Sequence, residues 1–271
     1  MTSVQTSYGQ NPARGYPGQF ADSRPCDVRT SIAEVAIAAG IPAMAGATTR
    51  AECRPPYTPD TADVDAILAT GGASASTAQT LSGSALDGVV GVGELIPPRP
   101  ITLVLSSHAN WDLTTALITG LDEDGGVIVE PVVIPDAGNA TVQTQRAFRK
   151  VTSVYIPAQA GTSGTFTVGF AAGIGALDHL MHGVAMYDAS REPEAYPIDY
   201  PVPCVRRGRV FVTSETSYVD GDPVFVRMVA TGGETAGHVR NVIDSTDCGV
   251  LRRARFVGTG SAGVAVIDLN T

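Results

Sequence analysis

The sequence predicts an all-β protein of two domains, and three observations support this prediction. Gly (30) and Pro (18) are frequent in the 271 residues, while aromatic residues make up only 6%, which suits short strands joined by tight turns. Short runs of β-forming residues recur between polar turns. The 44% hydrophobic content is enough to form a buried core in each domain.

Residues 1–22 are predicted to form a flexible N-terminal arm. The first fifteen residues are mostly Ser, Thr, Gln, Gly and Asn, and they contain too few apolar side chains to start a core. In the segment that follows, the Pro17-Gly18 pair is typical of a type II turn, and Tyr16 and Phe20 flank it. We expect such an arm to become ordered only on a partner.

The next part of the chain contains two possible helices. Ser31–Glu34 matches a capping box and predicts a helix over 32–39, but the same residues also alternate as in an extended segment. Both alternatives remain open at this point. A second helix is predicted over 62–69, and the Gly-, Ser-, Ala- and Thr-rich residues 69–84 predict a mobile loop or linker.

Five β-type runs then predict a small β-sandwich over residues 98–170. The proline run Pro97–Pro100 and the flexible Ala171–Gly175 bound it, so both edges resemble domain boundaries. The predicted strands are Ile101–Leu105, Ala116–Gly120, Val127–Ile134, Val151–Ile156 and Thr165–Phe170. We expect this sandwich to be inserted into an outer domain made of residues 23–97 and 171–271.

The C-terminal part of the chain is predicted to be a series of strands separated by turns. They are Val205–Thr213, Pro223–Ala230, Gly237–Ile243, Leu251–Val257 and Gly263–Leu269. Because strands occur on both sides of the insert, the outer domain should be a small β-barrel or jelly roll closed by N- and C-terminal segments together.

Composition argues against several classes of function. The formal net charge is −9 and the basic residues are scattered, so neither nucleic acid nor an anionic membrane is an expected partner. The four cysteines form no C-x-x-C pair, which favours free buried thiols over a zinc site. The N-terminus has no apolar signal region, and no stretch approaches the length of a membrane span, which predicts a protein made and used without secretion.

Candidate metal and catalytic motifs are weak. The acidic run Asp122–Asp124 lacks the distal glutamate of a calcium loop, so a solvated hairpin turn is favoured. His179 and His182 are three residues apart, whereas a metalloprotease needs H-E-x-x-H. No nucleophile elbow, P-loop or dinucleotide fingerprint occurs. We therefore predict no enzymatic activity, no cofactor and no metal site. Trp111, the only tryptophan, is interpreted as a packing residue, with a carbohydrate platform as the alternative.

Several segments resemble the structural cement or decoration proteins of tailed-phage capsids, of the kind found on the Bordetella phage head. The similarity covers roughly residues 16–50 and 180–270. The matching segments are 16–22, Ile41-Pro42 with Gly46, 182–187, 207–212, 220–226 and 251–256. The resemblance implies an Ig-like sandwich inserted into a capsid-binding domain, and it favours strand and loop over the helix at 31–46.

The resemblance also implies a function. We expect a non-enzymatic virion protein that is made in the host cytoplasm and cements the outer capsid surface by bridging neighbouring major capsid proteins. It would also associate with itself as a homo-dimer or homo-trimer on the capsid. The expected capsid-binding residues lie in the arm: Tyr16, Pro17, Gly18, Phe20 and Asp22. The alternative function is a virion adhesin that binds host-surface glycans through the inserted sandwich and Trp111.

Overall fold

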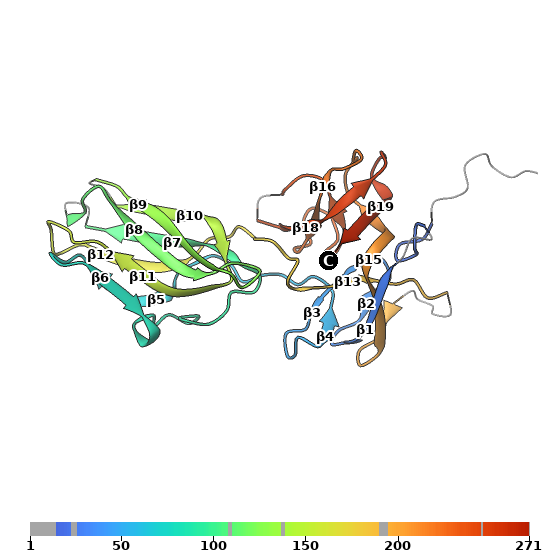
Figure 1. Ribbon diagram of the computed structural model, residues 1–271, viewed down its shortest axis with the longest axis horizontal. Coiled ribbons are helices and arrows are strands. Elements are labelled where there is room, and N and C mark those ends of the chain that lie inside the picture. The colour runs from blue at the N-terminus through green and yellow to red at the C-terminus, as the bar shows by residue number, and fades with distance from the viewer. Residues whose placement is uncertain are drawn as a thin grey trace, which may run out of the picture.

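The computed structural model describes residues 15–22, 26–107, 110–136, 139–189, 195–244 and 246–270. They form two bodies of β-strands placed end to end (Figure 1), and the only helical turn among them is η1 (Gly83–Ala85). The prediction of an all-β fold is confirmed. Within this part of the chain, no helix has the length and apolar character needed to span a membrane.

One body is a sandwich of two antiparallel four-stranded sheets (Figure 1, left). The first sheet has the order β10 (Ala140–Phe148), β7 (Arg99–Ser106), β12 (Thr165–Phe170) and β5 (Asp63–Ala73). The second has the order β6 (Gln79–Ser82), β11 (Lys150–Ile156), β8 (Thr114–Leu121) and β9 (Val127–Ile134). Alternate residues of the strands point inward and form one hydrophobic core between the sheets.

The sandwich begins at Asp63 and not at residue 98, because β5 and β6 belong to its sheets. β5 pairs with β12 and β6 with β11, so the predicted helix at 62–69 and the predicted linker at 69–84 are wrong. Gly72, just beyond the end of the predicted helix, lies within β5. It lies against the ring of Phe166, where a Cβ atom would overlap the ring. β10, between the third and fourth predicted strands, was also missed.

The outer domain contains the remaining strands (Figure 1, right). Its N-terminal strands are β1 (Asp27–Ala33), β2 (Ile37–Ala38), β3 (Pro42–Ala45) and β4 (Glu52–Arg54). Its C-terminal strands are β13 (Met181–Ala185), β14 (Ala195–Tyr196), β15 (Pro201–Ser214), β16 (Pro223–Arg227), β17 (Val239–Arg240), β18 (Cys248–Val257) and β19 (Gly263–Asn270). The segment 31–46 is therefore strand and loop, as the resemblance favoured, and not a helix.

The fourteen-residue strand β15 is shared by two closed rings of strands. Its first half pairs with β1 and β13, and the ring closes through β4 and β3. Its second half pairs with β19 and β17, and this ring closes through β18 and β16. Every strand of the first ring contributes to one hydrophobic cluster and every strand of the second ring to another, and the second cluster also includes Met44, Met181 and Val184 of the first ring. Instead of one barrel, the outer domain thus contains two small ones.

Arg99 ties together the two segments that cross between the domains. Its side chain is buried, and its guanidinium donates hydrogen bonds to the carbonyl oxygens of Ala171 (2.9 Å) and Asp60 (3.1 Å). It also lies over the ring of Phe170, 5.1 Å from the centroid. The amide of Ala171 donates in turn to Pro100. The expected flexible seam after the sandwich is therefore a bonded junction.

Candidate functional site

Residues 15–22 of the predicted arm lie along β15. The Gly18 amide donates to the Phe211 carbonyl (2.7 Å), the Phe211 amide donates to the Gln19 carbonyl (2.9 Å), and the Ala21 amide donates to the Arg209 carbonyl (2.9 Å). The segment is thus added to the outer domain much as a further strand would be. The expectation that the arm becomes ordered only on a partner is wrong for these residues, and residues 1–14 lie outside the described part of the chain.

Gly18 is the tightest point of this contact. It is buried, with a φ of +87° that glycine adopts without steric cost. A Cβ at this position would lie 2.6 Å from the Tyr187 backbone nitrogen and 2.7 Å from the Ala185 carbonyl oxygen. Pro17 packs closely against Gly40. The Pro17-Gly18 turn is therefore held in place by the outer domain on both sides.

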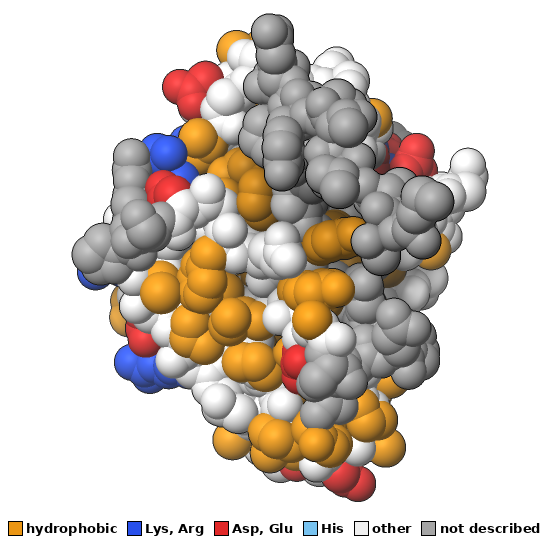
Figure 2. Space-filling model, turned by 90° about the vertical axis from the view of Figure 1, so that its right-hand side faces the viewer, with side chains coloured by type: hydrophobic (Ala, Val, Ile, Leu, Met, Phe, Trp, Pro, Cys, Tyr) orange, Lys and Arg blue, Asp and Glu red, His pale blue; other side chains and the backbone are white. Residues whose placement is uncertain are grey.

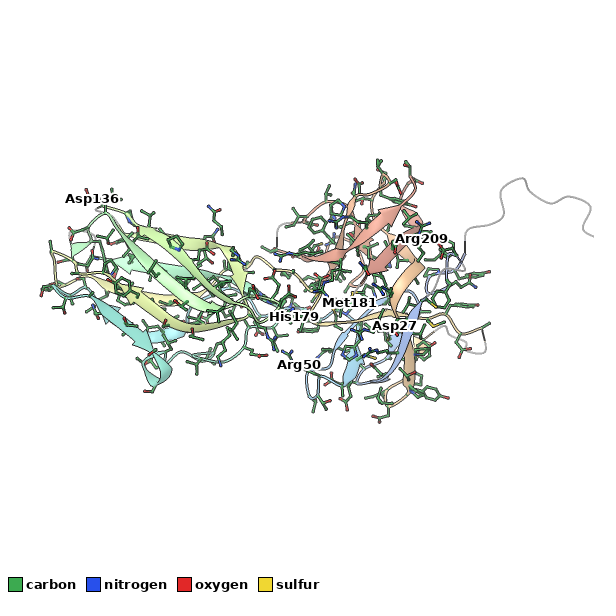
Figure 3. All side chains as sticks on the ribbon, in the orientation of Figure 1. Asp27, Arg50, Asp136, His179, Met181 and Arg209 are labelled. Carbon is green, nitrogen blue, oxygen red and sulfur yellow. The ribbon has the colours of Figure 1, made fainter. Side chains whose placement is uncertain are left out.

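Two further residues of the predicted site also face their own chain. Phe20 bridges Val210 of β15 and packs partly buried against the hydrophobic cluster of the second ring. The carboxylate of Asp22 lies 3.5 Å from Nε of Arg209. Figure 3 shows Arg209 on the side of the outer domain that faces away from the sandwich. Phe20 and Asp22 therefore help to hold the segment on β15.

Tyr16 is the exception among the five predicted residues, because its side chain is 59% exposed. It stacks on Tyr187, with 5.3 Å between the ring centroids and 12° between the ring planes. The structure thus brings all five residues together, with four of them turned toward the outer domain and the Tyr16 ring presented to solvent.

Four large apolar side chains are exposed where β1 meets the turn before β15. Ile32, Val35, Ile198 and Tyr200 are 41–61% exposed, and we call them the apolar end. Two backbone hydrogen bonds link the two segments, from Ala33 to the Tyr200 carbonyl and from residue 199 to the Ala33 carbonyl. Figure 2 shows patches of hydrophobic side chains on the face of the molecule that points away from the sandwich. Patches of exposed apolar side chains mark interaction surfaces.

The C-terminal half of the chain shows which family the protein belongs to. Residues 133–270, slightly more than half of the chain, match the family model described as structural cement protein (E217 gp24/Pam3 gp6). The chain belongs to this family of phage structural cement proteins. The match starts within β9, so it includes the last strands of the sandwich as well as β13–β19. Among curated proteins, none matches this chain.

In this member of the cement family, the acidic hairpin at 122–126 contacts the outer domain. Asp122 accepts hydrogen bonds from the amides of Asp124 and Gly126, so the hairpin turn was correctly predicted. Glu123, however, is 4% exposed and forms an ion pair with Arg252 of β18, and Asp124 lies 3.9 Å from Arg253. The hairpin is therefore an interdomain contact and not a solvated tip. Within the described ranges, no three His, Cys, Asp or Glu side chains converge as metal ligands would.

The two spaced histidines lie near this junction, where Figure 3 labels His179. They precede and enter β13, so they are not on a helix. Neither ring nitrogen of His179 has a hydrogen-bond partner among the described residues. Burial lowers the pKa of His179 to about 4, and Arg149 and Arg50 add to this effect. Nδ1 of His182 lies 2.6 Å from the Ser31 hydroxyl. Both histidines line one pocket, but among the described residues no third metal-ligating side chain joins them.

A second charged contact at the junction is centred on Glu94. Its carboxylate lies 2.6 Å from Arg50 of the outer domain and 2.8 Å from Arg149 of the sandwich. These ion pairs lower the pKa of Glu94 against the opposing effect of burial. The charged residues of both junction contacts, the acidic hairpin and Glu94, are visible in the sequence. Their pairing with arginines far away in the chain could not be inferred from it.

Trp111 is part of the sandwich core. It is 2% exposed, its Nε1 donates to the Ser106 carbonyl (2.8 Å), and its ring packs edge-on against Phe166. The interpretation as a packing residue is confirmed. A buried indole offers no stacking platform to a sugar ring, so nothing in this part of the sandwich favours the adhesin alternative.

Proposed function

We propose that this cement-family protein bridges neighbouring major capsid proteins on the outer surface of a tailed-phage capsid, without enzymatic activity. The observation that carries the proposal is the apolar end together with the exposed Tyr16 ring, all of them on the outer domain. The face of the molecule that points away from the sandwich also carries patches of hydrophobic side chains (Figure 2). Apolar area of this kind is stabilising only when another surface covers it.

In this arrangement the outer domain sits on the capsid and the sandwich projects outward. Each bridge adds buried interface that must be lost before two capsid proteins separate, so the bound shell is stabilised by mass action. Tyr16 contributes a large aromatic surface to the contact, as tyrosines at interfaces commonly do. Pro17, Gly18, Phe20 and Asp22 hold the Tyr16 segment in position on β15.

The proposal extends to self-association. A homo-dimer or homo-trimer would place two or three apolar ends on adjacent capsid proteins at once. Linking several weak contacts in this way raises the overall strength of binding without any new kind of contact. A protein that bridges a seam therefore benefits from more than one copy.

Capsids assembled without the protein provide the test. Adding wild-type protein should raise the temperature at which they release their contents, and Ile198→Asp with Tyr200→Asp should abolish both binding and this stabilisation. Val127→Asp is the matched control, because Val127 is 76% exposed but lies on the sandwich. Equal stabilisation by the apolar-end variant and the wild type would contradict the proposal.

A further inference from the structure

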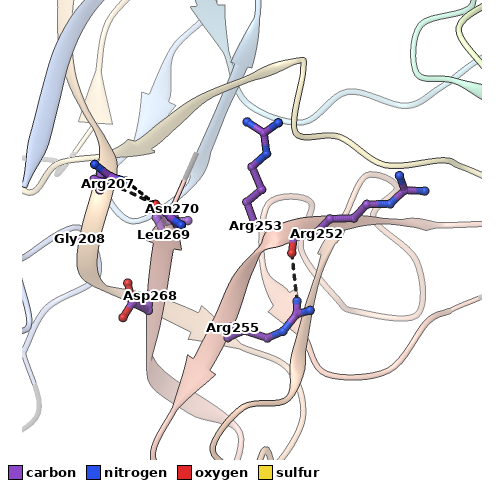
Figure 4. A pocket seen from close by; sticks show the side chains of 8 residues that line it. All are labelled: Arg207, Gly208, Arg252, Arg253, Arg255, Asp268, Leu269 and Asn270. Atoms are coloured by element: carbon purple, nitrogen blue, oxygen red, sulfur yellow. Dashed lines mark hydrogen bonds between the residues drawn. The ribbon is translucent and has the colours of Figure 1, made fainter. Parts of the chain in front are cut away.

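Four arginines surround a groove on the outer domain (Figure 4). Arg207 comes from β15, and Arg252, Arg253 and Arg255 come from β18, while Asp268 supplies the one acidic side chain of the lining. The groove has a volume of about 560 Å³, within the roughly 300–1,000 Å³ of ligand sites in general. It is a local concentration of positive charge in a chain whose formal net charge is −9.

Two of these guanidinium groups are not neutralised by any ion pair within the described residues. Arg207 donates two hydrogen bonds, of 3.0 and 2.8 Å, to the uncharged amide oxygen of Asn270. Arg255 donates to the backbone carbonyls of Ala254 (2.8 Å) and Arg252 (3.3 Å). The carboxylate of Asp268 already lies 3.3 Å from Arg209 outside the groove. Positive charge therefore remains available to an incoming anion.

The other two arginines show which chemistry the groove accepts. Arg252 pairs with Glu123 and Arg253 approaches Asp124, both from the tip of the sandwich hairpin. Two arginines that line the groove thus already bind carboxylates presented on a short acidic turn. The planar guanidinium suits carboxylates because it can donate two parallel hydrogen bonds.

We propose that the rest of the groove, around Arg207 and Arg255, binds an acidic peptide segment of a neighbouring capsid protein. This inference rests on the proposed function for the identity of the partner. A nucleic-acid backbone fits less well, because the surrounding chain is acidic and repels a long polyanion, whereas a few carboxylates interact only with the local field. The ion pairs with the hairpin tip favour the same kind of ligand.

A labelled hexaglutamate peptide tests the groove directly by fluorescence anisotropy with the full-length protein at low salt. We expect saturable binding that weakens by at least about tenfold, or 1.4 kcal/mol, in Arg207→Gln with Arg255→Gln. It should remain unchanged in Arg29→Gln, the matched control with a 67% exposed arginine on β1. A hexaglutamine peptide should not bind. Equal binding by the double variant and the control would overturn the inference, as would tighter binding of a thymidine hexanucleotide.

A second variant tests the groove by a gain of binding, which misfolding of the arginine variant could not imitate. Glu123→Gln with Asp124→Asn removes the carboxylate partners of Arg252 and Arg253 without changing the four arginines, so this variant should bind hexaglutamate more tightly. Unchanged or weaker binding by this variant would count against the inference.

Binding to whole capsids separates this inference from the proposed function. If Arg207→Gln with Arg255→Gln binds capsids as well as wild type does, the inference about the groove is wrong and the proposed function stands. If the wild-type protein does not bind capsids, the proposed function is wrong, and the peptide assay still tests whether the groove binds carboxylates.

Discussion

Arg227 and Glu215 form an ion pair inside the second ring of the outer domain, with 2.6 Å between Nε and Oε1 and both side chains 2% exposed. Arg227 also donates to Asp244 (3.0 Å) and to the Thr231 hydroxyl (3.1 Å). The pairing with Glu215 raises the pKa of Arg227, so the guanidinium stays charged. One arginine thereby connects β16 to three loops of the ring.

Removing this arginine should destabilise the fold strongly. Arg227→Met leaves the Glu215 carboxylate buried without its closest partner, and we expect the free energy of unfolding to fall by about 3–5 kcal/mol. Urea denaturation followed by circular dichroism measures this change. Arg29→Met is the control, since its exposed pair with Asp27 at 3.7 Å should contribute less than about 1 kcal/mol. Similar losses in the two variants would show that the buried pair has no special role.

Gly18→Ala should release the arm segment from β15. Both the positive φ and the close approach of Tyr187 oppose a side chain there, so the hydrogen bond from the Phe211 amide to Gln19 should open more often. Hydrogen exchange of the Phe211 amide should accelerate accordingly. Gly221→Ala separates the two causes, because Gly221 has a φ of +86° with nothing nearby. Unaltered exchange at Phe211 in Gly18→Ala would refute the steric role of this glycine.

His179 should make the protein less stable in acid. Its pKa of about 4 in the folded protein lies below its ordinary value of 6.5, so on acidification the unfolded chain takes up a proton before the folded one does. The stability that this neutral, buried ring provides is complete above pH 6.5 and is lost as the pH falls toward 4. Asp124 and Glu94 oppose the shift, while Arg149 and Arg50 favour it.

Two measurements test this pH dependence. The imidazole resonances of His179 should titrate with a midpoint near pH 4, and His179→Gln should lose less stability than wild type between pH 6.5 and pH 4. The charges around the ring are the same in the variant, so the difference isolates the histidine. A midpoint near 6.5 would contradict the burial of the ring.

The acidic hairpin should fix the orientation of the sandwich. Glu123→Gln with Asp124→Asn removes the carboxylate partners of Arg252 and Arg253, so small-angle X-ray scattering should show a broader distribution of interdomain distances. Asp136→Asn, at the far end of the sandwich in Figure 3, serves as the control with unchanged scattering. Identical profiles for the two variants would mean that the covalent crossings and Arg99 suffice to hold the domains.

Local patterns were sufficient to predict most strands but not all of them. Val127–Ile134 alternates regularly between exposed and buried residues, and the structure has β9 with the same bounds. β5 was not predicted as a strand, because its small residues give only weak alternation of buried and exposed positions. Its strand conformation depends on pairing with β12, which is distant in sequence. The two rings were unpredictable for a similar reason, since nothing local in β15 indicates that its halves have different neighbours.

The candidate site was predicted in part. The turn at Pro17-Gly18 and its flanking aromatics identified the segment, but no local pattern indicated that β15 would bind it. Ile32, Val35, Ile198 and Tyr200 come together only through the contact of β1 with the turn before β15, so they were not recognised as a surface. Arg252, Arg253 and Arg255 are close together in the sequence but were not recognised as a site, and Arg207 joins them only in three dimensions.

The shared strand has a mechanical consequence. Because β15 belongs to both rings, a pull exerted on one ring reaches the other along covalent backbone and does not depend on side-chain contacts between them. A slip of β15 by one residue would turn its inward side chains outward in both rings at the same time. We therefore expect the two rings of the outer domain to unfold together, as a single unit, when the domain is under tension.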